Sequence, residues 1–356
     1  MSDRPDPALP QRQPEAPPEA VAQFEPAHGD SGLQSMQRFL HRFPTMVPVI
    51  VLALALAGFG LLAPNFFSAF NLSLILQQVA IVGILAAAQS LVILTAGIDL
   101  SVGAVMVLTS VVMGKLGIGL GLPMPLALAG GLLAGGATGL LNGFLVTRLR
   151  LPPFITTLGT WNVFLALNYY ISDRETIRSQ TIDAEAPWLK FFGTRFNLGG
   201  ATLTYSVILL VLVFAALWFA LYHTAWGRRV YAVGDDKEAA ELAGIRTDRT
   251  LLSVYIVAGL ICALAGWASI GRVGSLSPTS FQEANLESIT AVVIGGISLF
   301  GGRGSILGPL IGALIVGVFN SGLKMMGVDV LWQLFATGWL IIIAVAVDQW
   351  IRKLTA

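Results

Sequence analysis

The sequence predicts an all-α polytopic membrane protein with about ten transmembrane helices, two related halves, and broken or re-entrant segments. The first supporting observation is composition: 55% of the 356 residues are hydrophobic and 12% are charged, whereas soluble domains have about 25% charged residues. The mean hydropathy is +0.76. The second observation is a series of long apolar stretches, and the third is a glycine-containing motif that occurs twice.

The first 43 residues differ from the rest of the chain. They contain seven prolines and no apolar stretch, a composition that cannot bury enough apolar surface to fold. Because no hydrophobic region begins until after Arg42, this segment is not a cleavable signal peptide. We expect a disordered cytoplasmic tail at 1–43, a transmembrane domain at 44–350 with a cytoplasmic loop at 224–250, and a cytoplasmic tail at 351–356.

Ten apolar stretches are candidate spans, since a helix needs about 20 such residues to cross a bilayer. The clear candidates are Pro44–Ala63, Leu74–Ala96, Pro125–Val146, Phe154–Ile171, Thr204–Tyr222, Leu251–Ile270 and Val330–Val347. Three candidates are short: Val102–Gly114, Ile289–Phe300 and Ile306–Phe319.

The basic residues predict the orientation. With both termini inside, 14 lysines and arginines face the cytoplasm and 7 face outward, which agrees with the positive-inside rule. The loop 172–200 then faces outward, where we expect a solvated connection or a contact with an external partner.

A polar stretch at 226–248 interrupts the apolar sequence and predicts a short exposed helix. Asp235 can cap it, with Glu238 three residues later as in a capping box, and Gly244 occupies the expected C-cap position. Ala239, Leu242 and Ala243 fall on one side at helical spacing. This small apolar side fits a docking helix, although a solvated loop joining two spans remains the alternative.

Glycines spaced by four predict close helix packing. Gly131, Gly135, Gly139 and Gly143 form one such series, and Gly304, Gly308 and Gly312 form another. The spacing indicates tight packing, with no direct role in transport required.

The motif G-I-x-L-x-x-G occurs at Gly97 and again at Gly296, each time after a β-branched apolar run. Paired, glycine-interrupted short segments point to broken helices beside a transport pathway. We therefore expect a pathway lined from both copies of the motif and facing a second copy of the chain. Its residues would be Gly97, Asp99, Ser101, Gly103, Gly296 and Ser298.

Two points about this repeat stay open. The copies lie six spans apart, which makes them parallel, so inverted halves would require one short piece to be re-entrant. Asp99 is a functional candidate because an acid at membrane depth is costly. It can equally cap the helix that begins at Ser101, and the two roles are compatible.

Several chemistries find no support in the sequence. No G-x-x-x-x-G-K-[ST] motif is present, the spans hold almost no acids besides Asp99, and no metal-ligand spacing or catalytic set stands out. We therefore expect no catalytic residue, metal or cofactor. The net charge of +1 gives no indication of nucleic acid binding, and the single cysteine, Cys262, is expected to be a packed thiol. Energy for transport should come from another subunit.

Four blocks of sequence resemble the permease subunits of bacterial ABC importers for monosaccharides, the ribose-type branch. The resemblance extends from about Asn71 to Asp348. The blocks are GIDLSVGA at 97–104, LPPFITTLGT at 151–160, GRRVYAVG with EAAELAGI at 227–245, and AVVIGGISLFGGRGS at 291–305.

The resemblance implies that two permease copies lie together in the membrane lipid and work with a cytoplasmic ABC ATPase and a periplasmic sugar-binding protein. It also implies a coupling helix that contacts the ATPase. That helix would contain Glu238, Ala239, Ala240 and Gly244, with Asp236 and Glu241 beside them.

The chain departs from the family pattern at three places. Asp235-Asp236 replaces a common Gly-Asn, Asn285-Leu286-Glu287 replaces Glu-Leu-Asp, and Pro309 replaces a common threonine. The first difference bears on ATPase pairing and the second on the outer gate or the substrate.

These observations predict a non-enzymatic permease subunit in the bacterial inner membrane that imports a pentose or a ketohexose, such as ribose or fructose. Import of nucleosides or branched-chain amino acids by a related permease is the nearest alternative. An ion-coupled secondary transporter is a second, and an integral membrane enzyme is a third that lacks a catalytic set.

Overall fold

The computed structural model describes residues 46–353, and the side chains of 344, 345 and 347–353 are outside the description. The predicted tail at 1–43 therefore lies outside the described residues. Helix α14 continues to Lys353, so it includes the first residues of the predicted C-terminal tail at 351–356, and that tail stays a prediction.

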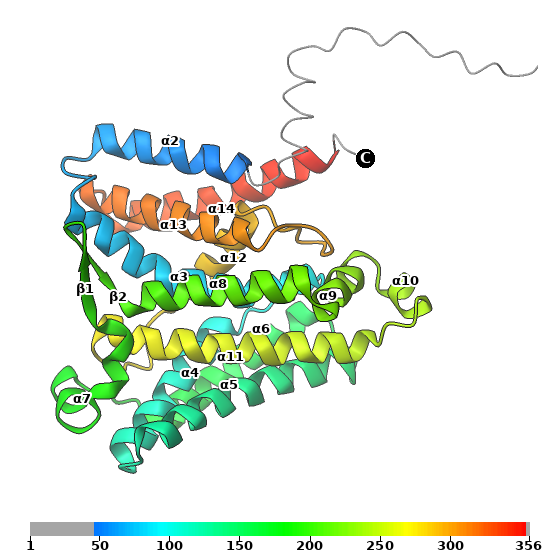
Figure 1. Ribbon diagram of the computed structural model, residues 1–356, viewed down its shortest axis with the longest axis horizontal. Helices are drawn as coiled ribbons and strands as arrows, with labels where there is room; N and C mark the ends of the chain where they lie inside the picture. Colours follow the sequence, from blue (N-terminus) through cyan, green and yellow to red (C-terminus); the bar gives the residue numbers. More distant parts are fainter. Residues whose placement is uncertain (1–45, 354–356) are drawn as a thin grey trace, which may run out of the picture. The chain divides into compact units, whose positions relative to one another are not determined.

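Helices make up most of the described chain (Figure 1). In order they are α2 (Met46–Leu62), α3 (Ala69–Leu94), α4 (Val102–Gly114) with a π-helical turn (Lys115–Gly119), α5 (Met124–Thr147), α6 (Pro153–Ser172), α7 (Ser179–Glu185), a 3₁₀ segment (Pro187–Gly193), α8 (Tyr205–His223), α9 (Ala225–Asp235), α10 (Lys237–Leu242), α11 (Thr247–Val273), α12 (Ala284–Ile294), α13 (Leu307–Met325) and α14 (Val330–Lys353). Two short strands, β1 (Arg195–Leu198) and β2 (Ala201–Thr204), form an antiparallel hairpin.

Among the described residues, six helices are long and apolar enough to cross a membrane: α3, α4 with its π-helical turn, α5, α8, α11 and α13. The short candidate at Val102–Gly114 gains the π-helical turn and reaches Gly119. The candidate at Ile289–Phe300 is displaced, because α12 covers Ala284–Ile294 and a turn follows it.

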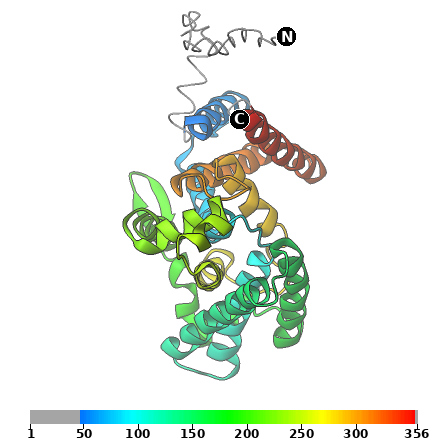
Figure 2. The same ribbon diagram turned by 90° about the vertical axis from the view of Figure 1, so that its right-hand side faces the viewer.

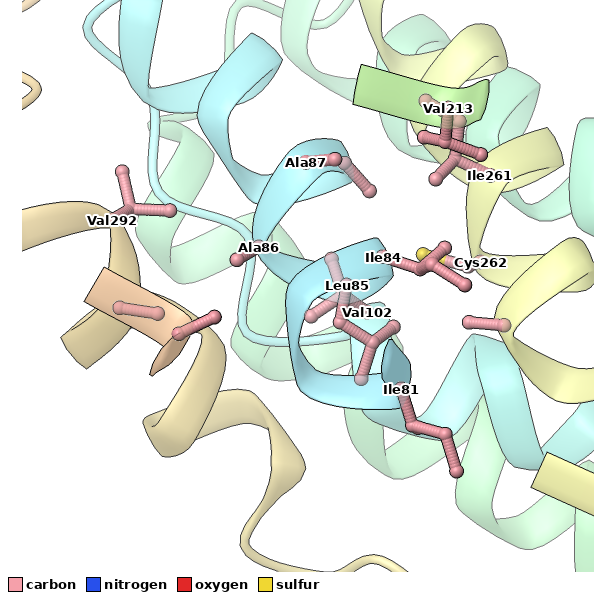
Figure 3. Packing of buried hydrophobic residues seen from close by; sticks show 14 of the residues in the cluster. Ile81, Ile84, Leu85, Ala86, Ala87, Val102, Val213, Ile261, Cys262 and Val292 are labelled. Carbon is pink, nitrogen blue, oxygen red and sulfur yellow. The ribbon is translucent and has the colours of Figure 1, made fainter. Parts of the chain in front are cut away.

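Helix α3 is the centre of the apolar core. Every residue from Val79 to Leu94 is buried, and most of them are apolar, as expected for a helix that is packed on every side. It packs against α8, α11, α12 and α13, and Figure 3 shows labelled side chains of α4, α8, α11 and α12 around it. Cys262 belongs to this core and is 1% exposed, which confirms the packed thiol.

The first glycine series brings α5 into backbone contact with α11. A methyl group on Gly135 would overlap the carbonyl oxygen of Gly259, and one on Gly139 would overlap that of Tyr255. The predicted close packing is confirmed for this pair. The second series is only partly a helix face, because Gly304 lies in the loop before α13, with φ +124°.

The segment expected to be a solvated loop at 172–200 is folded. It contains α7, the 3₁₀ segment and the first strand. Ile182, Ala186 and Leu189 are fully buried in a cluster that includes Ile270 of α11. The prediction of a solvated connection was therefore wrong. The sequence did not show this fold, because the apolar residues of the segment are too irregularly spaced to form a helical pattern.

Helices α8 and α11 run side by side, with the hairpin near one end and α9 and α10 at the other (Figure 1). Figure 2 faces the end that holds α9 and α10. The exits of α3 and α12 both lie at this end, since Gly302, in the loop after α12, donates its N–H to Leu94 at the end of α3 (3.0 Å). The two copies of the motif therefore follow parallel helices.

Candidate coupling helix and pathway turns

Helix α10 begins one residue later than the sequence suggested. Asp236, not Asp235, has the extended N-cap conformation, and its Oδ1 accepts the N–H of Ala239 (2.9 Å). Asp235 is the last residue of α9. Glu238 is exposed on the first turn, where a carboxylate is favourable beside the helix N-terminus.

The end of α10 matches the prediction for Gly244. This residue has φ +82°, a conformation that favours glycine. The N–H of Ile245 donates to the carbonyl of Ala240 (3.0 Å), and the N–H of Gly244 donates to that of Glu241 (2.9 Å). These bonds satisfy carbonyls at the helix end, as in a Schellman-type cap.

The two sides of α10 differ in burial. Ala240 is 4% exposed and packs against Val233 and Leu251. Leu242 is 91% exposed, and Ala239 and Ala243 are also exposed. The apolar side predicted from the sequence therefore faces away from the rest of the chain.

The burial of Ala240 corrects one expectation. The resemblance placed it in the helix that contacts the ATPase, but its side chain packs inside the chain. An Ala240→Arg change would place the arginine in the contact with Val233 and Leu251, so it would disrupt the loop itself as well as docking. Residues that test docking alone must come from the exposed side.

Two further contacts fix α10 to the start of α11. Thr247 Oγ1 donates to Glu241 Oε1 (2.5 Å). Lys237 Nζ lies 3.6 Å from Asp248 Oδ1, and since both side chains are about half exposed this pair adds little stability. The helix is thus held in a defined position while its outer side stays uncovered.

The first pathway turn, 95–101, is built around Asp99. Its Oδ1 accepts from the N–H (2.7 Å) and the hydroxyl (2.6 Å) of Ser101, the residue before α4. The side-chain amide of Gln89, in the orientation that satisfies both of its atoms, donates to the Asp99 carbonyl (2.9 Å) and accepts the Asp99 N–H (3.2 Å). The turn is therefore fixed through both the main chain and the side chain of Asp99.

Neighbouring helices hold the rest of this turn. Thr157 of α6 donates its hydroxyl to the carbonyl of Ile98 (3.0 Å) and accepts the N–H of Leu100 (3.1 Å). Asn142 of α5 donates to Ser101 Oγ (2.9 Å). Polar side chains from separate helices thus replace the hydrogen bonds that this irregular backbone lacks in a bilayer.

The structure buries the residues expected to face a second copy. Asp99 is 4% exposed, Ser101 is 0% exposed and Ser298 is 2% exposed. Gly97 donates its N–H to Val92 (3.0 Å), and Gly103 donates to Asn285 Oδ1 at the start of α12 (2.5 Å). These groups shape the turns from within, and a direct role in the pathway stays a prediction.

The second turn follows α12 and contains Gly296. It repeats the backbone geometry of the first turn, but the equivalent positions are shifted by one residue relative to the sequence motif. Gly296 has φ +83°, and Ile297 donates its N–H to Val292 (3.3 Å). In the first turn Ala96 has φ +59°, and Gly97 donates to Val92. Gly296 is therefore equivalent in conformation to Ala96, whereas the sequence motif matches it with Gly97.

Comparison with known proteins gives consistent matches. The family model described as "Branched-chain amino acid transport system / permease component" matches residues 71–345. The fructose import permease of Rhizobium meliloti is 60% identical, over 94% of this chain and 93% of that protein. The ribose import permease of Bacillus subtilis is 38% identical, over 90% and 95%, and the Escherichia coli xylose transport system permease is 33% identical, over 80% and 86%.

The chain belongs to this family of permeases. The membership confirms the predicted resemblance to the ribose-type permeases of ABC importers. The permease is a multi-pass inner-membrane protein and a transport subunit, not an enzyme. No solved structure matches it.

Sequence reasoning missed three residues that hold the turns of this permease, Gln89, Asn142 and Thr157, and it connected Asn285 with the outer gate or the substrate, not with the turns. Each is a buried polar residue within an apolar helix, and polar residues at membrane depth are expected to pair with one another or with the backbone. The polar residues themselves could have been noticed in the sequence. Their hydrogen-bond partners could not, because the partners lie on different helices.

Proposed function

We propose that this permease imports fructose, working with a cytoplasmic ATPase and a periplasmic sugar-binding protein. The observation that supports the substrate is the 60% identity with the Rhizobium meliloti fructose import permease over nearly the whole of both chains. Relatives named for ribose and xylose are 38% and 33% identical. Fructose is therefore favoured over the pentoses.

The proposed topology has ten spans and both termini in the cytoplasm. To the six long apolar helices it adds α2, α6, α12 and α14. The excess of basic residues on one side supports the orientation, and so does the position of α9 and α10 opposite the β1–β2 hairpin (Figure 1). Two related halves remain part of the proposal, supported by the similar turns after α3 and α12.

We infer that α10 is the coupling helix that the ATPase contacts. Asp236 and Gly244 define its ends, and Ala240 and Glu241 fix it to α9 and α11. Glu238, Ala239 and Leu242 are left exposed for contact. Leu242, which is 91% exposed, and the exposed Ala239 and Ala243 form one apolar side of a helix outside the spans, and such a side fits a surface that a partner covers.

A second copy of the permease is the proposed partner within the membrane. Helix α6 supports this assignment because its exposed side includes Asn162, whose amide donates, among the described residues, only within its own helix, to the carbonyl of Leu158 (3.1 Å). A polar side chain on a lipid-facing surface is unfavourable. Contact with a second copy, or with a hydrated pathway between two copies, would remove that cost.

Uptake by the purified complex tests the substrate and the energy source together. Proteoliposomes containing the permease, its ATPase and its binding protein would be loaded with ATP or with ADP and given labelled fructose, ribose, xylose, uridine or leucine. We expect ATP-dependent uptake of fructose above the other solutes. Preferential uptake of uridine or leucine would contradict the proposed substrate, and equal uptake with ADP would contradict the ATP-driven mechanism.

A further inference from the structure

Three segments of backbone from distant parts of the permease meet beside α10. They are the end of α3 at Leu94, the end of α9 at Gly234 and the loop after α12 at Gly302. Gly302 donates its N–H to the Leu94 carbonyl (3.0 Å). A methyl group on Gly234 would overlap that carbonyl oxygen and would lie 2.7 Å from the Gly302 nitrogen. The three backbones therefore touch with no side chain between them.

Neighbouring residues extend this contact on both sides. A methyl group on Gly301 would lie 2.5 Å from the Gly234 carbonyl oxygen and 2.7 Å from the nitrogen of Ala96. Tyr231, one turn earlier on α9, donates its hydroxyl to the carbonyl of Gly304 (2.9 Å). A tyrosine hydroxyl is protonated at neutral pH, and burial raises the pKa of Tyr231 further, so this group acts as the donor.

We name this contact the glycine junction and define it by Leu94, Gly234, Gly301 and Gly302. It adjoins both turns described above, because Leu94 precedes the turn that contains Asp99, and Gly301 and Gly302 belong to the loop after α12. Helix α9 thus touches the backbone of both turns through one short stretch.

Helix α10 has no flexible linker to α9. Asp236 is at once the C-cap of α9 and the N-cap of α10. Val233 of α9 and Ala240 of α10 are buried in the same small cluster. A displacement of α10 must therefore move the end of α9, and closely packed groups transmit such a displacement with little compression.

We propose that the glycine junction positions the two turns according to the state of the ATPase docked on α10. This inference rests on the proposed coupling role of α10 and adds the route by which that role reaches the spans. When α10 moves, the end of α9 would shift the last residues of α3 and the loop after α12 together. Gly234 is the positioning residue, because no larger side chain fits between the segments.

The test measures the ATP hydrolysed per sugar imported in proteoliposomes that hold the complete transporter. Gly234→Ala should still co-purify the ATPase, but the ratio should rise about fivefold or more, the lower end of typical coupling between sites. Gly58→Ala is the matched control, since nothing lies within 4 Å of the added methyl group. A purely structural defect would lower hydrolysis and uptake in proportion and leave the ratio unchanged, which would overturn the proposal.

A second variant decides the matter if Gly234→Ala fails to assemble. Tyr231→Phe removes only the hydroxyl that bonds Gly304 and should raise the same ratio about twofold or more. A wild-type ratio in Tyr231→Phe would then overturn the junction. Docking itself is tested separately by the affinity of the ATPase for a Leu242→Ala variant, so loss of affinity there, with unchanged ratios in the junction variants, would reject the junction alone.

Discussion

Leu242→Ala should weaken binding of the ATPase without destabilising the permease. Leu242 is 91% exposed, so its truncation should change the free energy of unfolding by no more than about 0.5 kcal/mol. If the ATPase covers this side chain, the variant removes three buried carbons from the contact, worth about 0.8 kcal/mol each. Incomplete burial brings the expected loss to about 2 kcal/mol, or roughly 30-fold in Kd.

The assay is a titration of the ATPase onto permease in nanodiscs, together with the thermal unfolding midpoint of each variant. Leu61→Ala is the matched control, since Leu61 is a leucine of α2 that is 89% exposed. Ala240→Leu should behave differently from both, because Ala240 is buried and overpacking costs typically 1–3 kcal/mol of stability. Wild-type affinity in Leu242→Ala would refute the assignment of the exposed side of α10 as the docking surface.

Three further outcomes follow from the same structure. Asp99→Asn keeps an acceptor for the Ser101 N–H, whereas Asp99→Ala leaves that buried donor unpaired and should lower the unfolding free energy by about 1–3 kcal/mol; equal thermal midpoints for the two variants would contradict this role. Asp236→Ala should cost α10 about 1 kcal/mol and reduce ATPase binding, while Asp236→Asn should retain it because asparagine caps equally well; equal binding by both would argue against the cap. A reporter fused after Lys237 should be cytoplasmic and one fused after Asp183 periplasmic, and the reverse result at either site would overturn the orientation.

Much of this fold could be predicted because the bilayer imposes a strong pattern on the sequence. Apolar length located the six described helices that are long and apolar enough to cross a membrane, and glycine spacing indicated the close packing seen between α5 and α11. Gly244 was recognisable because few other residues tolerate its positive φ. The fold of the segment 172–200 was not recognisable, because its short helix and 3₁₀ turn bury apolar residues without a regular period.

Helix α10 shows which features of the structure the local sequence pattern cannot predict. Asp235 and Asp236 are both suitable caps by residue type, and only the length of α9, which includes Asp235, decides between them. Ala239 and Ala240 are likewise equivalent in composition. Ala240 turns inward because Val233 and Leu251 come from elements on either side of α10, and a contact between three separate elements is not visible in the spacing of any one of them.

The repeated motif shows most clearly that sequence alignment alone does not predict the conformation of the two turns. Aligning the glycines pairs Gly97 with Gly296, but the hydrogen bonds that end α3 and α12 pair Ala96 with Gly296. An alanine with φ +59° is unfavourable in isolation, so its sequence gives no sign of this conformation. It is held here by its surroundings, since Asp99 beyond it is bonded by Gln89 and Ser101 and the Gly301 backbone lies against it. On this account the backbone strain at Ala96 is maintained by the same glycine junction that links α9 to both turns.

Ala96→Gly should relieve this backbone strain and raise the thermal unfolding midpoint of the permease in detergent. A lower midpoint would show that Ala96 is not strained.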